Sequence, residues 1–330
     1  MFFRLSLALL LLLTCRPPVQ AAEMKKVVFI RYRIAPTSFA TVINGVKEGM
    51  RKRGYVEGRN IRYVDVLTRT ADKDSVPEVL AAVDEQRASA DMFITCGWVS
   101  LYARDKLKGS AVPQLFVPVL RSVALKMLPS VTEPPQTNLS GVYLMYPPEK
   151  ILRLAHLILP QMKRYAYVYD SRVPADMIFK SAYEALSTAD RHGLNLFFID
   201  LAGGAEPAVQ EFKEKNIEAY GGIVGVFKHR TALARSGLPV ITSLALDIGR
   251  AEIGDYVRTS NVVAGLFNSF GYCGRQAAEM TADIFDGKRT IEETVPRPSS
   301  QTAFVNLSAA ERLRLPISFT VLEAVDIVVR

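Results

Sequence analysis

The stretch "KKVVFIRYRIAPTSFATVINGVKEGM" (residues 25–50) decides the fold class, because it predicts one buried strand followed by one helix. Its first eight residues form a β-branched and aromatic run that is typical of a buried strand. Pro36, Thr37 and Ser38 then favour a helix start. Apolar residues follow at three- and four-residue spacing, which places one apolar stripe on a helix face: Phe39, Val42, Ile43, Val46 and Met50.

The same alternation continues along the first half of the chain. Strands are expected at residues 60–67, 92–97 and 112–120, and helices at 75–87 and 99–107. A strand that is followed by a helix again and again predicts a parallel sheet covered by helices on both faces.

The pattern pauses in "NLSGVYLMYPPEK" (residues 138–150) and then starts again. Helices are expected at 149–159, 174–192 and 207–215, with a long one ending at Phe285, and strands at 165–171, 194–201, 218–227, 238–244, 261–267 and 302–308. Two successive series predict an α/β fold with two similar doubly wound lobes, although no close sequence repeat links them.

The N-terminus has the order of a secretory signal. Arg4 precedes an apolar run at residues 5–13, which is too short to span a bilayer, and Val19-Gln20-Ala21 supplies a small-x-small cleavage site. We therefore expect residues 1–21 to be a signal peptide and the chain to be exported to the periplasm. A lipid anchor through Cys15 is the alternative.

Charge and cysteine content narrow the class further. The formal net charge of +8 is modest and favours anionic surfaces or ligands. Only Cys96 and Cys273 follow the signal, so a disulfide scaffold is excluded. We expect two buried free thiols, and one bond between them is the alternative.

No motif for catalysis or for a cofactor is found. The sequence lacks a GxSxG elbow and a GxxxxGK[ST] loop, and "GGIVGVF" (residues 221–227) is predicted to be a glycine-bearing strand. His156, His192 and His229 stand apart from other metal-ligand residues. We therefore predict no enzyme activity, no metal and no cofactor.

The basic stretch "VKEGMRKRGYVEGRN" (residues 46–60) is the one cluster that could suggest nucleic-acid binding. Its basic residues end the first helix, where positive charge favours the C-terminal dipole, and Gly54 is predicted as the left-handed residue after that helix. We therefore expect a helix stop here and no nucleic-acid partner.

Four segments carry a family resemblance: "GYVEGRNI" (54–61), "NLSGV" (138–142), "FGYCGRQAAEMTADIFDGK" (270–288) and "FVNLSAAERLRLPI" (304–317). In this order they resemble the substrate-binding proteins of ABC importers, of the type often assigned to aromatic amino acids.

The resemblance implies a periplasmic binding protein fold of type I, with two lobes, three crossing segments and a ligand cleft that closes by a hinge. It places 23–142 plus 267–290 in lobe 1 and 143–266 plus 291–330 in lobe 2. The implied partners are a small-molecule ligand and ABC permease subunits, and we expect a monomer.

Departures from the family pattern cluster at the expected cleft. Leu120-Arg121-Ser122 stands where the family commonly has Asp-Pro, Gly97-Trp98 replaces a common Gly-Thr, and residues 245–260 have no clear counterpart. An arginine suits a carboxylate or phosphate, so we hypothesise a ligand of anionic character. A planar part of it could stack on Trp98.

Strand-end loops supply the candidate ligand-binding residues. Thr37 and Ser38 could instead cap a helix, Trp98 could be a packed lid, and Arg121 could pair with an acid. The full set is Tyr32, Thr37, Ser38, Trp98, Ser100, Arg121, Ser122, Ser171, Arg172, Phe227, Phe267 and Asn268.

Three functions remain open from the sequence. The first is an exported solute-binding protein that delivers its ligand to an ABC importer. The second keeps the fold but signals to a membrane sensor or signalling enzyme. The third is an exported α/β enzyme, for which no nucleophile or metal set is found.

Overall fold

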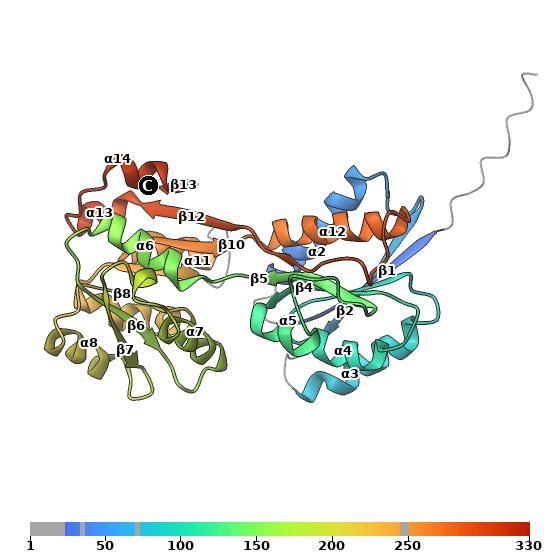
Figure 1. Cartoon of the computed structure of the whole chain (residues 1–330), viewed down its shortest axis with the longest axis horizontal. Helices are drawn as coiled ribbons and strands as arrows, with labels where there is room; N and C mark the ends of the chain where they lie inside the picture. Colours follow the sequence, from blue (N-terminus) through green and yellow to red (C-terminus); the bar gives the residue numbers. More distant parts are fainter. Residues whose placement is uncertain (1–23, 34–36, 70–72, 245–250) are drawn as a thin grey trace, which may run out of the picture.

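The computed structural model describes residues 24–33, 37–69, 73–244 and 251–330. These residues form two α/β lobes that lie side by side, and the chain passes between them at three places (Figure 1). Each lobe is built on one sheet with helices on both faces. The predicted two-lobe α/β fold is therefore confirmed. The predicted signal peptide and Cys15 lie outside the described residues.

Lobe 1 holds a six-stranded sheet in the order β11-β5-β4-β3-β1-β2, and all of its paired strands are parallel. In Figure 1, α2 and α12 cover one face and α3, α4 and α5 cover the other. The strands are β1 (Lys25–Tyr32), β2 (Ile61–Thr68), β3 (Met92–Thr95), β4 (Gln114–Leu120), β5 (Leu139–Leu144) and β11 (Arg297–Pro298). The helices are α2 (Thr37–Lys52), α3 (Val76–Gln86), α4 (Val99–Leu107), α5 (Arg121–Met127) and α12 (Phe270–Phe285), with a 3-10 turn at Lys73–Ser75.

Lobe 2 holds a seven-stranded sheet in the order β13-β12-β10-β9-β8-β6-β7. It is parallel except between β10 and β12, which are antiparallel. The strands are β6 (Arg164–Tyr169), β7 (Asn195–Asp200), β8 (Ala219–Gly221), β9 (Val240–Leu244), β10 (Val262–Asn268), β12 (Gln301–Asn306) and β13 (Ile327–Val329). The helices are α6 (Pro148–Ile158), α7 (Pro174–Glu184), α8 (Ala205–Glu214), α9 (Val224–Lys228), α10 (Arg230–Leu233), α11 (Ala251–Thr259), α13 (Leu307–Arg312) and α14 (Phe319–Glu323), with 3-10 turns at Ala189–Arg191 and Ala234–Ser236.

The chain crosses between the lobes after β5, after β10 and after β11. The predicted boundaries at residues 142, 266 and 290 stay a prediction. Because β11 pairs with β5 in the lobe 1 sheet, we propose that the last segment of lobe 1 extends to Pro298.

Helices α2 and α12 pack through small residues. A Cβ atom added to Gly274 would lie 2.1 Å from the carbonyl oxygen of Val42, and one added to Gly45 would lie 2.2 Å from that of Gly271. Such distances are far below van der Waals contact, so the two backbones approach closely only because these glycines lack side chains. This contact fixes α12, which returns from lobe 2, onto lobe 1.

The predicted helix stop at Gly54 is confirmed. Gly54 has φ +87°, its N–H donates to the Arg51 carbonyl at 3.1 Å, and the Tyr55 N–H donates to the Met50 carbonyl at 3.0 Å. These two bonds are those of a Schellman motif. Arg53 just before it forms ion pairs of 2.9 Å with Asp283 and Asp286 at the end of α12.

The predicted helix at 174–192 is too long. Helix α7 ends at Glu184, and a separate 3-10 turn follows at Ala189–Arg191. Ser187 accepts the N–H of Asp190 at 3.2 Å, so a side chain competes with the helical bonding pattern there.

The strand predicted at 218–227 is wrong in its second half. β8 ends at Gly221, and α9 begins at Val224. The carboxylate of Asp176 in α7 accepts the N–H groups of Val224 and Gly225 at 2.9 and 2.8 Å, which starts the helix. Phe227 therefore lies on a helix and not at a strand end.

Arg121 and Ser122 were expected in a loop after the strand, but β4 runs directly into α5, whose first residue is Arg121. Helices α11, α13 and α14 and strand β13 were not expected either.

Cys96 and Cys273 are both buried and free, as predicted. Burial raises the pKa of Cys96 well above its usual range and that of Cys273 to about 12, so both thiols stay protonated at neutral pH. Among the described helices, none is long and apolar enough to cross a membrane.

Candidate functional site

The crossing strands orient the carboxyl ends of both sheets toward the hinge. β5 ends at Leu144 in lobe 1 and its chain continues into lobe 2, whereas β10 ends at Asn268 in lobe 2 and continues into lobe 1. Each runs parallel to a neighbour in its own sheet, β4 and β9 respectively. The carboxyl ends of these strands therefore point toward the other lobe, and ligands of open α/β sheets bind at such ends.

A cavity of about 340 Å³ lies at this edge of the sheets, and we call it the interlobe pocket. Its walls come from the start of α5 in lobe 1, from the crossing segment after β5, and from α7 in lobe 2. Figure 1 shows α5 and α7 on facing sides of the two lobes. The lining residues are Leu120, Arg121, Ser122, Leu125, Leu144, Met145, Tyr146, Pro147, Pro148, Glu149, Ile178, Phe179 and Ala182.

Arg121 supplies a positive charge to the interlobe pocket. Its side chain is exposed, and within the described part of the chain its guanidinium has neither a hydrogen bond nor an ion pair. The alternative of an ion pair with a nearby acid is thus not seen there. Because all five N–H donors stay available, Arg121 can bind a carboxylate or a phosphate with two parallel hydrogen bonds.

Ser122 adds a hydroxyl to the same wall. Its Oγ atom is buried and has no hydrogen-bond partner among the residues described. A buried polar atom without a partner costs about 1–3 kcal/mol, so a ligand that bonds with this hydroxyl would recover part of that free energy.

An aromatic pair forms the opposite side of the pocket. The rings of Tyr146 and Phe179 meet edge to face, with centroids 4.9 Å apart and an interplanar angle of 68°. Burial raises the pKa of Tyr146 well above its usual range, so this phenol stays neutral at physiological pH. The pocket therefore combines the free guanidinium of Arg121, the half-buried carboxylate of Glu149 and a largely apolar wall.

Three other candidates of lobe 1 lie outside this pocket. Tyr32 is buried at the end of β1, and Ser100 is fully buried with its hydroxyl donating to the Thr95 carbonyl at 3.1 Å. Trp98 is partly exposed at the start of α4, and the ammonium of Lys126 lies 5.7 Å from its ring centroid. Trp98 is thus the one of these three with an accessible aromatic surface.

Thr37 and Ser38 begin α2. Their side chains lie outside what the structure describes, so their predicted contact with a ligand stays a prediction.

The lobe 2 candidates Ser171 and Arg172 follow β6, but Arg172 is already engaged. Its Nε and Nη2 atoms donate to the two carboxylate oxygens of Asp170 at 2.8 Å each. This fork lowers the pKa of Asp170 to about 2. The main-chain N–H of Ser171 donates to Asp200 at 3.0 Å. These contacts hold the turn after β6 in place.

Phe227 and Phe267 pack inside lobe 2. Phe227 lies edge-on to Tyr256 at a centroid distance of 5.3 Å, and Phe267 is 3% exposed beside Phe304. Neither residue lines the interlobe pocket.

Asn268 is buried at the hinge. Its amide donates to the Met145 carbonyl at 3.0 Å, and its carbonyl oxygen accepts the Ser299 hydroxyl at 2.5 Å. Each of these three residues lies on a different crossing segment. Asn268 therefore ties the crossings together, and its predicted contact with a ligand stays a prediction.

Arg121 and Ser122 are thus the two candidates that the structure brings into the interlobe pocket. Tyr146 and Phe179 were not among the sequence candidates, because no local motif marks them. The two prolines after Tyr146 were the available signal, since they mark the chain leaving the strand. Within the described residues, no cluster of His, Cys, Asp and Glu could hold a metal ion.

The sequence was compared with known families and structures. The family described as ABC transporter substrate binding protein matches residues 28–329. The chain belongs to this family. It is a class of binding proteins and not of enzymes, in agreement with the missing catalytic motifs. No curated protein matches the sequence significantly.

Solved structures of other proteins show the same fold. An ABC domain from Streptococcus pneumonia in complex with L-Trp has a TM-score of 0.71 and 14% identity, covering 93% of this chain and 100% of that one. The ligand-free, open substrate binding protein CD0873 from Clostridium difficile has a TM-score of 0.73 and 16% identity, covering 89% and 96%. A conserved domain protein from Vibrio cholerae has a TM-score of 0.68 and 18% identity, covering 93% and 99%. At these identities the likeness shows the fold, which is that of type I periplasmic binding proteins.

Proposed function

We propose that this substrate-binding protein captures a small organic anion in the interlobe pocket and delivers it to an ABC importer. The free guanidinium of Arg121 beside an apolar wall is the observation that carries the proposal. A carboxylate bound to Arg121 would gain charge-assisted hydrogen bonds, and its apolar part would pack against Tyr146 and Phe179.

The volume of about 340 Å³ is at the small end for ligand pockets and favours a ligand of a few tens of atoms at most. The solved relative that binds L-Trp supports a ligand with a carboxylate and an aromatic part. In this proposal the lobes close on the ligand, so that α5 and α7 approach each other. The crossing segments act as the hinge.

Ligand recovered with the protein provides a direct test. The protein is purified under native conditions and then denatured, and the released small molecules are identified by mass spectrometry. The proposal expects a compound that is anionic at neutral pH and is lost from an Arg121→Gln preparation. Recovery of a cation that persists in Arg121→Gln would contradict it.

We further propose export, with residues 1–21 removed as a signal peptide. N-terminal sequencing of protein from the periplasmic fraction would show a start at Ala22. Genes for a permease and an ATPase beside this gene would support the importer, whereas a kinase or cyclase gene there would favour a sensory role.

A further inference from the structure

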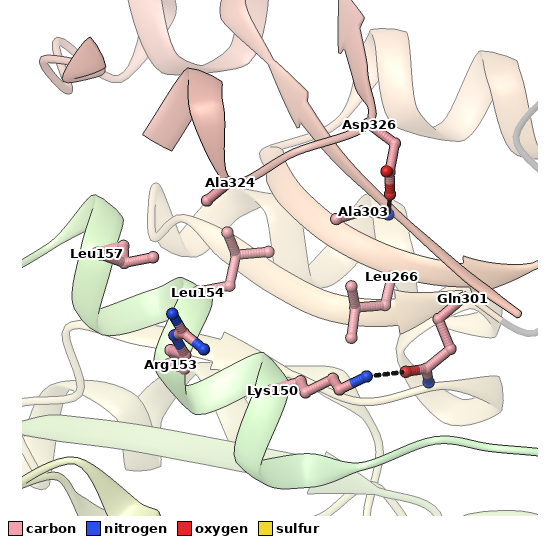
Figure 2. Close-up of a pocket in the computed structure, with 9 residues that line it drawn as sticks. All are labelled: Lys150, Arg153, Leu154, Leu157, Leu266, Gln301, Ala303, Ala324 and Asp326. Carbon is pink, nitrogen blue, oxygen red and sulfur yellow. Dashed lines mark hydrogen bonds between the residues drawn. The ribbon is translucent and has the colours of Figure 1, made fainter. Parts of the chain in front are cut away.

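A second cavity, of about 310 Å³, lies within lobe 2, and we call it the α6 pocket. It is bounded by α6, by strands β10 and β12, and by the segment after α14 (Figure 2). It shares no lining residue with the interlobe pocket. The α6 pocket therefore lies outside the proposed transport site.

Apolar side chains line the interior of the α6 pocket. Leu154 and Leu266 are buried, Ala303 is half-buried, and Figure 2 shows the three grouped between α6 and the strands. A short alkyl chain of a ligand would lose its contact with water against this wall. Burial of such a chain contributes about 0.8 kcal/mol per methylene group.

Two cations of α6 lie at the rim. Lys150 and Arg153 are both exposed, and in the described regions no hydrogen bond or ion pair engages the guanidinium of Arg153. One acid, Asp326, also lines the pocket, but one of its carboxylate oxygens accepts the Ala303 N–H at 2.7 Å. The formal charges of the lining residues sum to +1, and the guanidinium of Arg153 presents free N–H donors beside the apolar interior.

Lys150 is held at its place on the rim. Its ammonium donates to the Oε1 atom of Gln301 at 3.1 Å, and the Nε2 atom of Gln301 donates to the Met145 carbonyl at 2.8 Å (Figure 2 shows the first bond). An ammonium has three N–H donors, so two stay available for a ligand. A cation that is fixed before binding loses less conformational entropy when the ligand arrives.

We propose that the α6 pocket is a second ligand site, which binds a small monocarboxylate with a short alkyl chain. Arg153 and Lys150 bind the carboxylate, and the chain packs on Leu154, Leu266 and Ala303. The proposal does not depend on the function of the interlobe pocket.

Binding of hexanoate, measured by ligand-detected NMR and calorimetry, tests this site. All variants carry Arg121→Gln, which removes the cation of the interlobe pocket, so the two sites are kept apart. Hexanoate should bind with a Kd of about 1 mM. Acetate should bind more weakly because it lacks the alkyl chain, and hexylamine should bind more weakly because it has the opposite charge.

Two added substitutions locate the binding site. Arg153→Gln should weaken hexanoate binding about 10-fold or more, and Ala303→Leu, which fills the cavity, should abolish it. Arg235→Gln is the matched control, because Arg235 is a strongly exposed arginine of lobe 2 that does not line the pocket, and it should leave the Kd unchanged.

Three results would overturn the proposal: no hexanoate binding, equal binding of hexylamine, or full retention of hexanoate binding by the Arg153→Gln variant. Circular dichroism of each variant confirms that it is folded. Should Ala303→Leu fail to fold, Ala324→Leu at the exposed mouth of the pocket takes its place.

Discussion

The side-chain amide of Asn268 donates a 3.0 Å hydrogen bond to the main-chain carbonyl of Met145, which joins the crossing segment after β10 to the one after β5. The third crossing segment is joined through Ser299, whose hydroxyl bonds with Asn268 and also accepts the Met145 N–H at 3.3 Å. Three segments that are far apart in the sequence therefore form one hydrogen-bonded hinge.

Loss of the Asn268 side chain should destabilise this hinge. In Asn268→Ala the Ser299 hydroxyl loses its acceptor, and the half-buried Met145 carbonyl keeps only its hydrogen bond from Gln301. We expect this loss to lower the free energy of unfolding by about 1–2 kcal/mol. Urea denaturation measures the change. Asn195→Ala, at an exposed asparagine of β7, is the control and should change stability by less than about 0.5 kcal/mol. Equal stability of the two variants would contradict the role of Asn268.

Because α2 and α12 approach closely, glycine-to-alanine substitutions at two positions of α12 should change stability in opposite directions. Gly274→Ala places a Cβ atom 2.1 Å from the Val42 carbonyl oxygen, so the helices must separate. We expect a loss of about 1–3 kcal/mol of stability, as for other overpacked sites.

The matched control is Gly271→Ala, whose nearest neighbour, the Cγ2 atom of Thr41, would be in ordinary contact at 3.4 Å. There the higher helix propensity of alanine should make stability equal to or up to about 1 kcal/mol above that of the wild type. Thermal unfolding of both variants would refute the packing argument if Gly274→Ala were as stable as Gly271→Ala.

The ion pair between Arg172 and Asp170 should make stability depend on acid pH. Arg172 lowers the folded-state pKa of Asp170 to about 2 from a usual 3.8, so the ionised carboxylate stabilises the fold. This contribution is present above about pH 4 and is lost as the pH falls toward 2.

Because the Arg172 side chain is 59% exposed, solvent screening keeps this contribution small. Arg172→Gln should therefore be less stable than the wild type at pH 6, and the difference should shrink near pH 2.5. Urea unfolding at both pH values measures it, and a difference that grows on acidification would contradict the assignment.

Much of the fold could be predicted from local patterns. The strand at Lys25–Tyr32 and the stop at Gly54 depend on residues that are close in sequence, and the structure has both. The start of α9 could not be predicted in this way. Its first N–H groups bond with Asp176, which lies 48 residues before Val224 and meets it only in the folded lobe.

Residues of the candidate site could be predicted from the sequence where the strand order alone puts them at the cleft. Arg121 and Ser122 directly follow a parallel strand, and this position brings them to the interlobe pocket. Tyr146 lies on the crossing segment after β5 and Phe179 on α7 of lobe 2, and only the folded chain sets their rings 4.9 Å apart. Arg172 also follows a strand, but its guanidinium is bound by the nearby Asp170, which strand position cannot reveal.

Calorimetry on refolded, ligand-free protein tests the claim that Arg121 selects an organic anion most directly. Phenylacetate and phenethylamine have similar size and opposite charge. Each is titrated into the wild type, into Arg121→Gln and into the control Arg59→Gln. Arg59 is an exposed arginine that does not line the pocket. We predict that the wild type and Arg59→Gln prefer phenylacetate by at least about 10-fold and that Arg121→Gln loses about 10- to 100-fold of that affinity. Equal binding of both compounds, or unchanged phenylacetate binding by Arg121→Gln, would contradict the account.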